Sequence, residues 1–557
     1  MSAIVKQYDK RIGVTYAYES ISYWDKEKKQ SRAKRKLIGI VDPETGEIKP
    51  TTKKKREASG AGGNRGTSKA PSNTEPETPW LYARRVFYGA TYLLDCIGKE
   101  TGVAADLEAC FPETYKQIQS IAYFLILEDK NPLCRFPKWD KLHSHPYGQC
   151  ISSQQSSALF SQVTESQRMH FFRLQGVKRL DKEYWAYDTT SISSYSESLR
   201  QVRYGKNKDG DQLPQINLAM LFGEESCLPF YYKKLPGNIS DVATVKQLLK
   251  DMEFLYCAKT KMVMDRGFYS ESNINDLLAE RMKFLMGAKL SLKYVDRELD
   301  KVRESIRSWQ NFLPDSETYG LTVPIRWSYR RKRPYKGDEI HEDRRMYLHF
   351  YFDTIKALDD ERKFTTLIYR LNGELISGNR EKGNERLYAK YFDVRETPVR
   401  GKKVMAKEDV LAGARKNFGF FALIGNETMD AERALHIYRN KDMVEKAFDN
   451  VKDRLDMKRM NVSSDLSLDG KLFVEFVALI YIAYLHQAML DAHLYTKYTM
   501  HELLDYLEVI ECFDREGYAP QIGEITDKQM EVYEMLGFDP PTLTQNRICR
   551  QIEHQVQ

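Results

Sequence analysis

The order of apolar and helical runs in residues 181–290 restricts the possible folds more than any other feature of this chain. Short apolar runs predict strands there, and runs with helical spacing separate the last three of them. The predicted strands cover 184–188, 216–222, 228–233, 262–265 and 284–287, and the predicted helices cover 241–255 and a segment from about 272. Three successive strands followed by alternating helices and strands predict an α/β fold, a mixed sheet with helices on its faces.

Two of these predicted strands end in a carboxylate, Asp188 in one and Asp265 in the other. Because strand ends in an open sheet face a common crevice, we expect the two side chains to lie close together. A single aspartate at a strand end is more often a turn or cap residue. The two aspartates therefore indicate a functional site only if another carboxylate is predicted to lie near them.

A third carboxylate, Glu445, lies on a predicted helix that carries two stripes. The apolar stripe is Ile437, Val444, Phe448, Val451 and Leu455, and the polar stripe beside it is Tyr438, Lys441, Glu445 and Lys452. Both sets recur at helical spacing, so the carboxylate is held between two lysines at the edge of a core. The alternative is pairing of Lys441 with Glu445 on a solvated helix face.

Three carboxylates that converge in one crevice repel each other unless cations bind between them. Oxygen ligands select Mg²⁺, with Mn²⁺ possible. Two such ions about 4 Å apart activate a water or a 3′-hydroxyl and stabilise the leaving oxygen of a phosphodiester. The pattern therefore indicates phosphoryl transfer without a covalent enzyme intermediate.

The same residues resemble the DDE transposases of bacterial insertion sequences, in the branch with the signature Y-x2-R-x3-E-x6-K. Here the signature is Tyr438, Lys441, Glu445 and Lys452, with lysine in place of arginine, while Arg439 lies nearby but off the stripe. The segments 187–191, 235–241 and 264–268 match further blocks of this family. Lysine keeps the positive charge but loses the bidentate phosphate contact that arginine makes.

The resemblance implies a ribonuclease-H-like core with a β-rich insertion before the Glu-bearing helix. It implies that Asp188, Asp265 and Glu445 are the catalytic residues and hold two metal ions. It also implies cut-and-paste transposition, in which the enzyme cleaves double-stranded DNA at the terminal inverted repeats and transfers the strands into target DNA, acting as a homodimer on paired ends. Two alternatives share this fold: a DNA-binding relative without catalysis, and a metal-dependent nuclease without strand transfer.

The resemblance also implies that several residues of this chain contact DNA. Lys441 and Lys452 would bind phosphates, and Tyr438 would hydrogen-bond one. The basic run at 326–333 would contact the DNA backbone through Arg330, Arg331 and Arg333, or would be a solvated charge run. Related enzymes stack an insertion tryptophan on a flipped base, and Trp309 and Trp327 are the candidates, with a core or surface position as the alternative for each.

The remaining sequence predicts the domain layout. The predicted regions are a small β module (1–50), a flexible linker (51–78), a helical DNA-binding region (79–180), the first part of the core (181–290), the insertion (291–415), the second part of the core (416–495) and a helical C-terminal region (496–557). An apolar stretch from Trp80 to Gly98 predicts a helix that opens either a loose helix-turn-helix or a plain helical bundle.

Composition adds limits on location and partners. A net charge of +7 permits a polyanionic partner, and eight scattered cysteines without a C-x-x-C pair favour a reducing cytosol. The first residues lack the apolar core of a signal peptide. The apolar run 472–490 contains Glu475 and His486, so we expect a helix buried in protein rather than a membrane span. No glycine-rich phosphate loop is present, so no nucleotide cofactor is expected.

Overall fold

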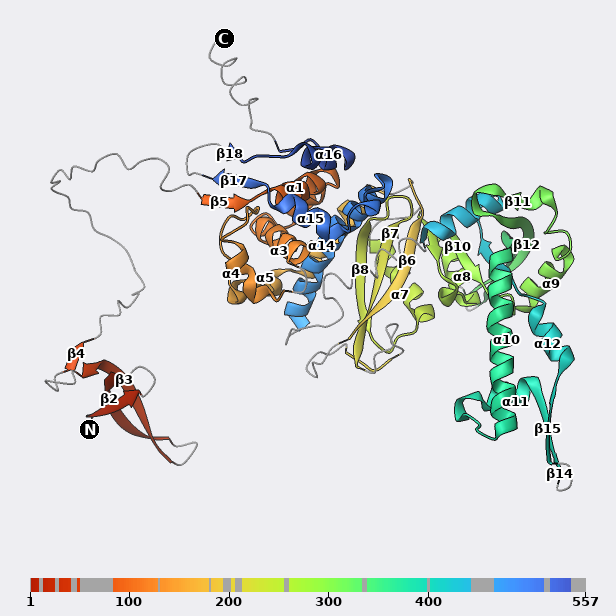
Figure 1. Ribbon diagram of the computed structural model, residues 1–557, viewed down its shortest axis with the longest axis horizontal. Helices are drawn as coiled ribbons and strands as arrows, with labels where there is room; N and C mark the ends of the chain where they lie inside the picture. Colours follow the sequence, from red (N-terminus) through yellow and green to blue (C-terminus); the bar gives the residue numbers. More distant parts are fainter. Residues whose placement is uncertain are drawn as a thin grey trace, which may run out of the picture. The chain divides into compact units, whose positions relative to one another are not determined.

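The chain forms two compact units, Met1–Thr78 and Pro79–Gln557 (Figure 1). The computed structural model describes residues 2–9, 14–25, 30–41, 48–50, 84–128, 131–179, 182–193, 202–205, 213–254, 260–332, 338–397, 401–441, 465–514 and 521–541. The first unit holds a four-stranded sheet in which each strand pairs antiparallel with the next. Its strands are β1 (Ser2–Asp9), β2 (Val14–Asp25), β3 (Gln30–Val41) and β4 (Ile48–Pro50). This confirms the strands predicted between Val14 and Val41.

Five strands of the second unit form the mixed sheet predicted for residues 181–290, in the order β8-β7-β6-β9-β10. Their bounds are β6 (Trp185–Ser193), β7 (Gln215–Gly223), β8 (Pro229–Pro236), β9 (Lys261–Met264) and β10 (Lys283–Ala288). The first three pair antiparallel, whereas β9 runs parallel to β6 and β10 parallel to β9. The parallel strands need crossover helices, and α7 (Asp241–Phe254) and α8 (Glu271–Ala279) supply them. This strand order is that of a ribonuclease-H-like core.

Three strands of the insertion and the strand that follows it extend the same sheet. The sheet continues from β10 through β16 and β13 to β12 and β11, which gives nine hydrogen-bonded strands. The added strands are β11 (Phe312–Leu313), β12 (Thr318–Lys332), β13 (Glu339–Phe352) and β16 (Phe420–Gly425). The predicted helix at 294–310 is shorter, α9 (Lys293–Val302), and is followed by a single 3-10 turn, η4 (Trp309–Asn311).

The insertion also contains an arm with a core of its own. Its elements are α10 (Thr354–Ser377), α11 (Glu385–Tyr391), β14 (Phe392–Thr397), β15 (Gly401–Ala406) and α12 (Glu408–Arg415). Phe364, Leu371 and Leu375 of α10 pack with Tyr388 and Leu411 in a cluster separate from the main core. Figure 1 shows α10, α11 and β15 together in this arm. The insertion is therefore as helical as it is stranded.

A helical bundle makes up the rest of the second unit. Its helices are α1 (Gly89–Glu100), α2 (Val103–Cys110), α3 (Tyr115–Leu127), α4 (Phe136–Trp139), α5 (Ser153–Gln162), α6 (Glu165–Val177), α14 (Asp465–Asp491), α15 (Met500–Glu508) and α16 (Asp527–Met535). The helix predicted from Trp80 begins only at Gly89, because residues 84–87 form strand β5 (Arg84–Phe87). β5 pairs with β17 (Glu511–Asp514), which also pairs with β18 (Gln521–Ile522). That partner is distant in sequence, so local periodicity did not reveal the strand.

Helix α14 passes through the bundle and contacts α3, α5 and β8. It is long and apolar enough to cross a membrane, but 78% of its most apolar window is buried inside the protein. The charge within it is compensated, since Lys471 lies 3.3 Å from Glu475, whose side chain is buried. This confirms the predicted helix buried in protein.

Candidate active site

Strands β6 and β9 place two predicted carboxylates at neighbouring positions. Tyr187 pairs with Met264 in the parallel ladder, so Asp188 and Asp265 each follow a paired residue by one position. Neighbouring strands lie about 4.8 Å apart, which brings the two backbones within reach of one ligand. Asp265 follows the end of β9 as predicted.

Asp188 does not end its strand, contrary to the prediction. β6 continues to Ser193, because the polar residues after Asp188 pair with β7 and their side chains are buried. Thr189 explains part of this continuation, since its hydroxyl donates to Asp241 Oδ1 at 2.7 Å. The prediction was too short because it followed only the apolar run, which stops before Asp188, while the strand continues through polar residues that are buried.

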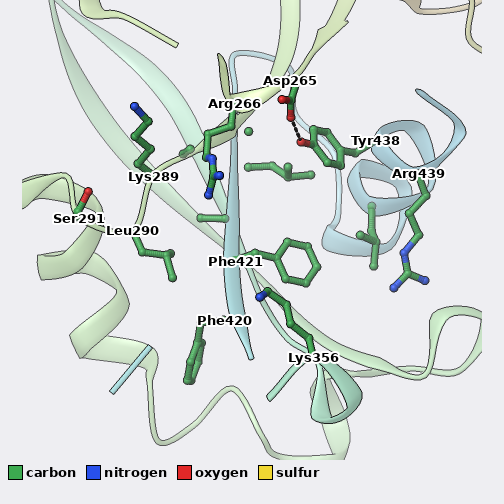
Figure 2. A pocket seen from close by; sticks show the side chains of 15 residues that line it. Asp265, Arg266, Lys289, Leu290, Ser291, Lys356, Phe420, Phe421, Tyr438 and Arg439 are labelled. Atoms are coloured by element: carbon green, nitrogen blue, oxygen red, sulfur yellow. Dashed lines mark hydrogen bonds between the residues drawn. The ribbon is translucent and has the colours of Figure 1, made fainter. Parts of the chain in front are cut away.

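Tyr438 holds Asp265 by a direct hydrogen bond. Its hydroxyl donates to Asp265 Oδ1 at 2.8 Å, as Figure 2 shows. Burial alone would raise the pKa of the Asp265 carboxyl. The bond from Tyr438, the backbone amides of Arg266 and Gly267 and the charge of Lys441 oppose that effect and leave the pKa below its usual value. Asp265 is therefore a half-buried carboxylate that stays ionised.

Lys441 lies beneath this pair, away from solvent. Its side chain is 2% exposed, and its ammonium lies 5.5 Å from the centre of the Tyr438 ring. The polar stripe of the predicted helix is thus split, with Tyr438 half-buried and Lys441 inside the protein. Such a buried ammonium stabilises the charge of Asp265 but presents little surface to a phosphate. Glu445 and Lys452 lie outside the described residues.

Several contacts fix the described part of this helix, residues 431–441, against the sheet. Asp430 Oδ1 accepts from the amide of Arg433 at 2.7 Å at the start of the helix. Near its other end, Asn440 Nδ2 donates at 2.5 Å to Glu224 Oε1 in the β7–β8 turn. Glu224 is 1% exposed, and burial raises the pKa of its carboxyl to about 7, against the opposing effect of the bond from Asn440.

A basic cavity of about 760 Å³ opens beside Asp265 and Tyr438. Its cationic lining residues are Arg266, Lys289, Lys356 and Arg439, which Figure 2 shows around the cavity. Sequence reasoning gave none of these four as a site residue. Lys289 could have been found, because it directly follows β10 and should face the crevice where the parallel strands end. Nothing near Lys356 in the sequence points to the site.

Arg439, which lies off the polar stripe, is the cation of this helix that lines the cavity. Its side chain is 43% exposed at the cavity wall, where the guanidinium contacts Thr318 Oγ1 at 3.3 Å and lies 4.0 Å from Asp353. The one-residue offset from Tyr438 turns it by about 100° on the helix, which is why periodicity excluded it from the stripe. The packing nevertheless brings Arg439 and Tyr438 to the same cavity.

Asp241 is a further carboxylate at this site. Asn217 holds the loop before it, donating to the carbonyl of Ile239 at 3.1 Å. A Cβ atom at Gly267 would lie 3.5 Å from Asp241 Oδ2 and 4.0 Å from Asp265 Oδ2, so both carboxylates face Gly267. From the sequence, Asp241 was predicted only to lie at the start of the helix 241–255.

Comparison with known proteins decides the family. The family model described as Transposase DDE domain matches residues 179–481, more than half of the chain. The chain belongs to the DDE transposase family. A search of curated proteins finds no match. Among solved structures, the cryo-EM structure of the piggyBac transposase synaptic complex with hairpin DNA is similar at 10% identity and a TM-score of 0.28. That match covers 58% of this chain and 51% of the other, so this chain spans about half the length of the transposase it matches.

The DNA contacts predicted in the insertion of this transposase lie on two elements, β12 and η4. On β12, Arg330 and Arg326 are exposed on one face, whereas Trp327 is 7% exposed on the other. The Trp327 indole donates to Asn275 Oδ1 at 2.9 Å, and this buried position is the core alternative considered for Trp327. Strand alternation separates a basic-aromatic run onto two faces.

Trp309 and the other arginines of the run differ from Trp327. Trp309 is 82% exposed in η4, a position from which an indole can reach DNA. Arg331 lies 3.9 Å from Glu280 in an exposed pair. Arg333 lies outside the described residues.

Members of this family generally use divalent metal ions. Within the described ranges, no group of three or more His, Cys, Asp or Glu side chains is close enough to hold one. Asp188 and Asp265 provide two carboxylates on neighbouring strands, and the low pKa of Asp265 keeps one of them ionised. These two residues fit a hard cation such as Mg²⁺ or Mn²⁺.

Proposed function

We propose that this transposase performs cut-and-paste transposition, with cleavage at the ends of its element and transfer of the freed 3′ ends into target DNA. The observation that carries this proposal is the placement of Asp188 and Asp265 on neighbouring strands, with Asp265 at the wall of the basic cavity. Carboxylates alone would suit many metal enzymes. Carboxylates next to several exposed cations suit a phosphodiester substrate.

Asp188, Asp265 and Glu445 are proposed to hold two divalent ions, Mg²⁺ or Mn²⁺. Bound there, the ions would supply Lewis-acid activation of the attacking oxygen and stabilise the leaving oxygen. The chain itself keeps Asp265 ionised through the Tyr438 hydroxyl and the buried Lys441. We therefore assign Tyr438 and Lys441 to positioning and charging this carboxylate.

Phosphate binding is assigned to the exposed cations of the cavity. Arg439 has the planar guanidinium that matches two phosphate oxygens, and it would take the role of the signature arginine. Arg266 and Lys289 would bind neighbouring phosphates as charges. In the insertion, Arg330 would contact the DNA backbone and Trp309 would stack on an unpaired base.

The proposed partner is double-stranded DNA, as terminal inverted repeats and as target. A homodimer on paired ends, acting in the cytoplasm, completes the proposal.

The direct test uses Asp188→Asn, Asp265→Asn and Glu445→Gln on a terminal-repeat duplex with Mg²⁺. Each variant should lose cleavage while binding the duplex, because the substitutions remove charge and keep shape. Asp505→Asn, in an exposed pair with His501, serves as the control and should cleave like the wild type. Mg²⁺-dependent cleavage at the wild-type rate by any of the three would disprove the assignment.

A second assay separates the two alternatives. Duplexes that already carry free 3′-hydroxyl ends are mixed with a target plasmid, and joined products are measured. A transposase yields joined products, whereas a nuclease without strand transfer yields only further cuts. An inactive DNA-binding relative would bind the duplex and give neither product.

A further inference from the structure

An exposed apolar stripe runs along α10, on the side away from the core of the arm. Seven large apolar side chains among the described residues are at least 66% exposed, and four of them lie on this helix. They are Ile355 (71%), Leu358 (73%), Tyr369 (82%) and Ile376 (66%). Scattered apolar residues at a surface need no explanation, but a concentration on one helix marks an interaction surface.

The helical positions confirm that the four residues form one face. With 100° per residue, they fall within about 60° of one another, together with Arg362 and Gly373. The buried residues Phe364, Leu371 and Leu375 lie on the opposite side, where they pack with α11 and α12. The stripe therefore belongs to a helix that is already anchored, and its exposure does not result from a missing core.

The stripe is symmetric about the midpoint between Thr365 and Thr366. Ile355 and Ile376 are equally distant from this point, as are Leu358 and Gly373, and Arg362 and Tyr369. An antiparallel pair of identical helices centred there would place each residue against its symmetry mate. Ile355 would meet Ile376, Arg362 would lie over the ring of Tyr369, and Leu358 would face Gly373.

Gly373 is open enough for this contact. A Cβ atom at Gly373 would meet nothing within 4 Å, so the protein leaves space at that point. A glycine opposite a leucine lets two helices approach closely, as a small residue does beneath a large one. The exposed charges beside the stripe also match. Asp359 and Arg370 lie on the same flank of α10, so a two-fold axis would bring Asp359 of one copy near Arg370 of the other.

We propose that α10 is a dimerisation helix, which pairs antiparallel with α10 of a second copy of this chain. A self-complementary patch is what a two-fold interface requires, whereas an unrelated partner would need no symmetry. One helix pair buries less than about 1,200 Å², so we expect a reversible dimer. The proposal requires no DNA and no catalysis, and its failure would leave the proposed function untouched.

The test is sedimentation of the full chain without DNA over about two orders of magnitude in concentration. The wild type should shift from monomer to dimer. Leu358→Glu and Tyr369→Glu should each weaken dimerisation by at least about tenfold, because each contact occurs twice across a two-fold axis. Val509→Glu, at an exposed apolar residue of the helical bundle, is the matched control and should dimerise like the wild type.

Gly373→Leu distinguishes specific pairing from general apolar association. It has room in a single copy and makes the stripe more apolar, so non-specific association would increase. Pairing with Leu358 of the partner subunit would instead be blocked, and the dimer should weaken. Stronger association of Gly373→Leu, a wild type that stays monomeric, or a dimer unaffected by both glutamate variants would each overturn the proposal.

Cysteine cross-linking then shows whether the two α10 helices run parallel or antiparallel. With the exposed Cys134 and Cys150 replaced by serine, a mixture of Leu358→Cys and Gly373→Cys chains should form a mixed disulfide dimer. Homodimeric disulfides of Leu358→Cys alone would indicate a parallel pair and refute the antiparallel one.

Discussion

Gly287 provides the sharpest test of the site, because a single methyl group there would press on the residues that hold Asp265. Gly287 is buried in β10 and lines the basic cavity. A Cβ atom at this position would lie 2.9 Å from the backbone nitrogen of Arg266 and 3.0 Å from the hydroxyl oxygen of Tyr438. Both atoms would have to move, and the hydroxyl is the one that donates to Asp265.

The distances set the size of the effect. Ordinary contacts begin at 3.4 Å, so the hydroxyl must retreat by 3.4 − 3.0 = 0.4 Å. A retreat along the bond would lengthen the 2.8 Å hydrogen bond to about 3.2 Å. Overpacking of this kind costs about 1–3 kcal/mol of stability. A hydrogen bond to a charged group is worth about 1.5–3 kcal/mol, so Gly287→Ala should slow cleavage by roughly 10- to 100-fold.

Single-turnover cleavage of a terminal-repeat duplex measures this loss, and a thermal melt measures the stability. Gly425→Ala is the control, because its Cβ would also crowd a backbone atom, the Phe284 carbonyl at 2.9 Å, but Gly425 does not line the cavity. Gly287→Ala should lose more activity than Gly425→Ala at equal stability. In a Tyr438→Phe background the loss should shrink, since the displaced hydroxyl is gone. Full activity of Gly287→Ala would refute the reasoning.

Three further predictions follow from the same geometry. Arg439→Gln should weaken duplex binding and lower the dependence of the binding constant on salt concentration by about one in the log–log slope. Lys441→Gln should instead slow cleavage and leave binding unchanged. Anisotropy titrations at several salt concentrations measure binding, and weaker binding by Lys441→Gln with normal binding by Arg439→Gln would contradict this prediction. Because burial raises the pKa of Glu224 to about 7 in the folded protein, its contribution to stability is full below about pH 4.5 and is lost as the pH rises towards 7. Glu224→Gln should remove this loss, so the stability of the variant relative to the wild type should rise by roughly 2–3 kcal/mol between pH 4.5 and pH 8. Hydrogen exchange around residues 223–228 measures this difference. Equal pH profiles for the two proteins would contradict the prediction. Trp309→Ala should leave the melting temperature unchanged, because its ring is exposed, and should reduce cleavage without affecting simple binding; a lowered melting temperature would assign it to the core instead.

The sequence revealed those parts of the site that depend on local pattern. Apolar runs predicted the succession of strands and helices along the core, and the apolar run before Asp265 placed that carboxylate at the end of β9. Asp188 was found at the right place for the wrong reason, since β6 runs past it. Local pattern was enough to pick out Asp188 and Asp265 as neighbours, because each follows an apolar run that forms a strand of the same sheet.

The depth of a residue in the protein did not follow from pattern. Lys441 shares a helical stripe with Tyr438, yet it is buried while Arg439 reaches the cavity. The difference depends on what packs around the helix, which the spacing of its own residues does not show. The same holds for Trp327, whose burial depends on Asn275 of α8. Only the tertiary packing separates a phosphate ligand from a buried charge.

The continuity of the nine-stranded sheet also bears on the shape of the DNA that this transposase can cleave. Four ladder steps, through β13, β16 and β10, connect β12 with β9. Adjacent strands rotate by about 20–25°, so β12 crosses β9 at roughly 80–100°. Rotating one strand against the other would break backbone hydrogen bonds, which leaves no hinge between them. The arginines of β12 and Asp265 are therefore held at a fixed angle, and a duplex that contacts both has to fit that angle. We expect ends whose base steps bend easily to fit it at the lowest cost.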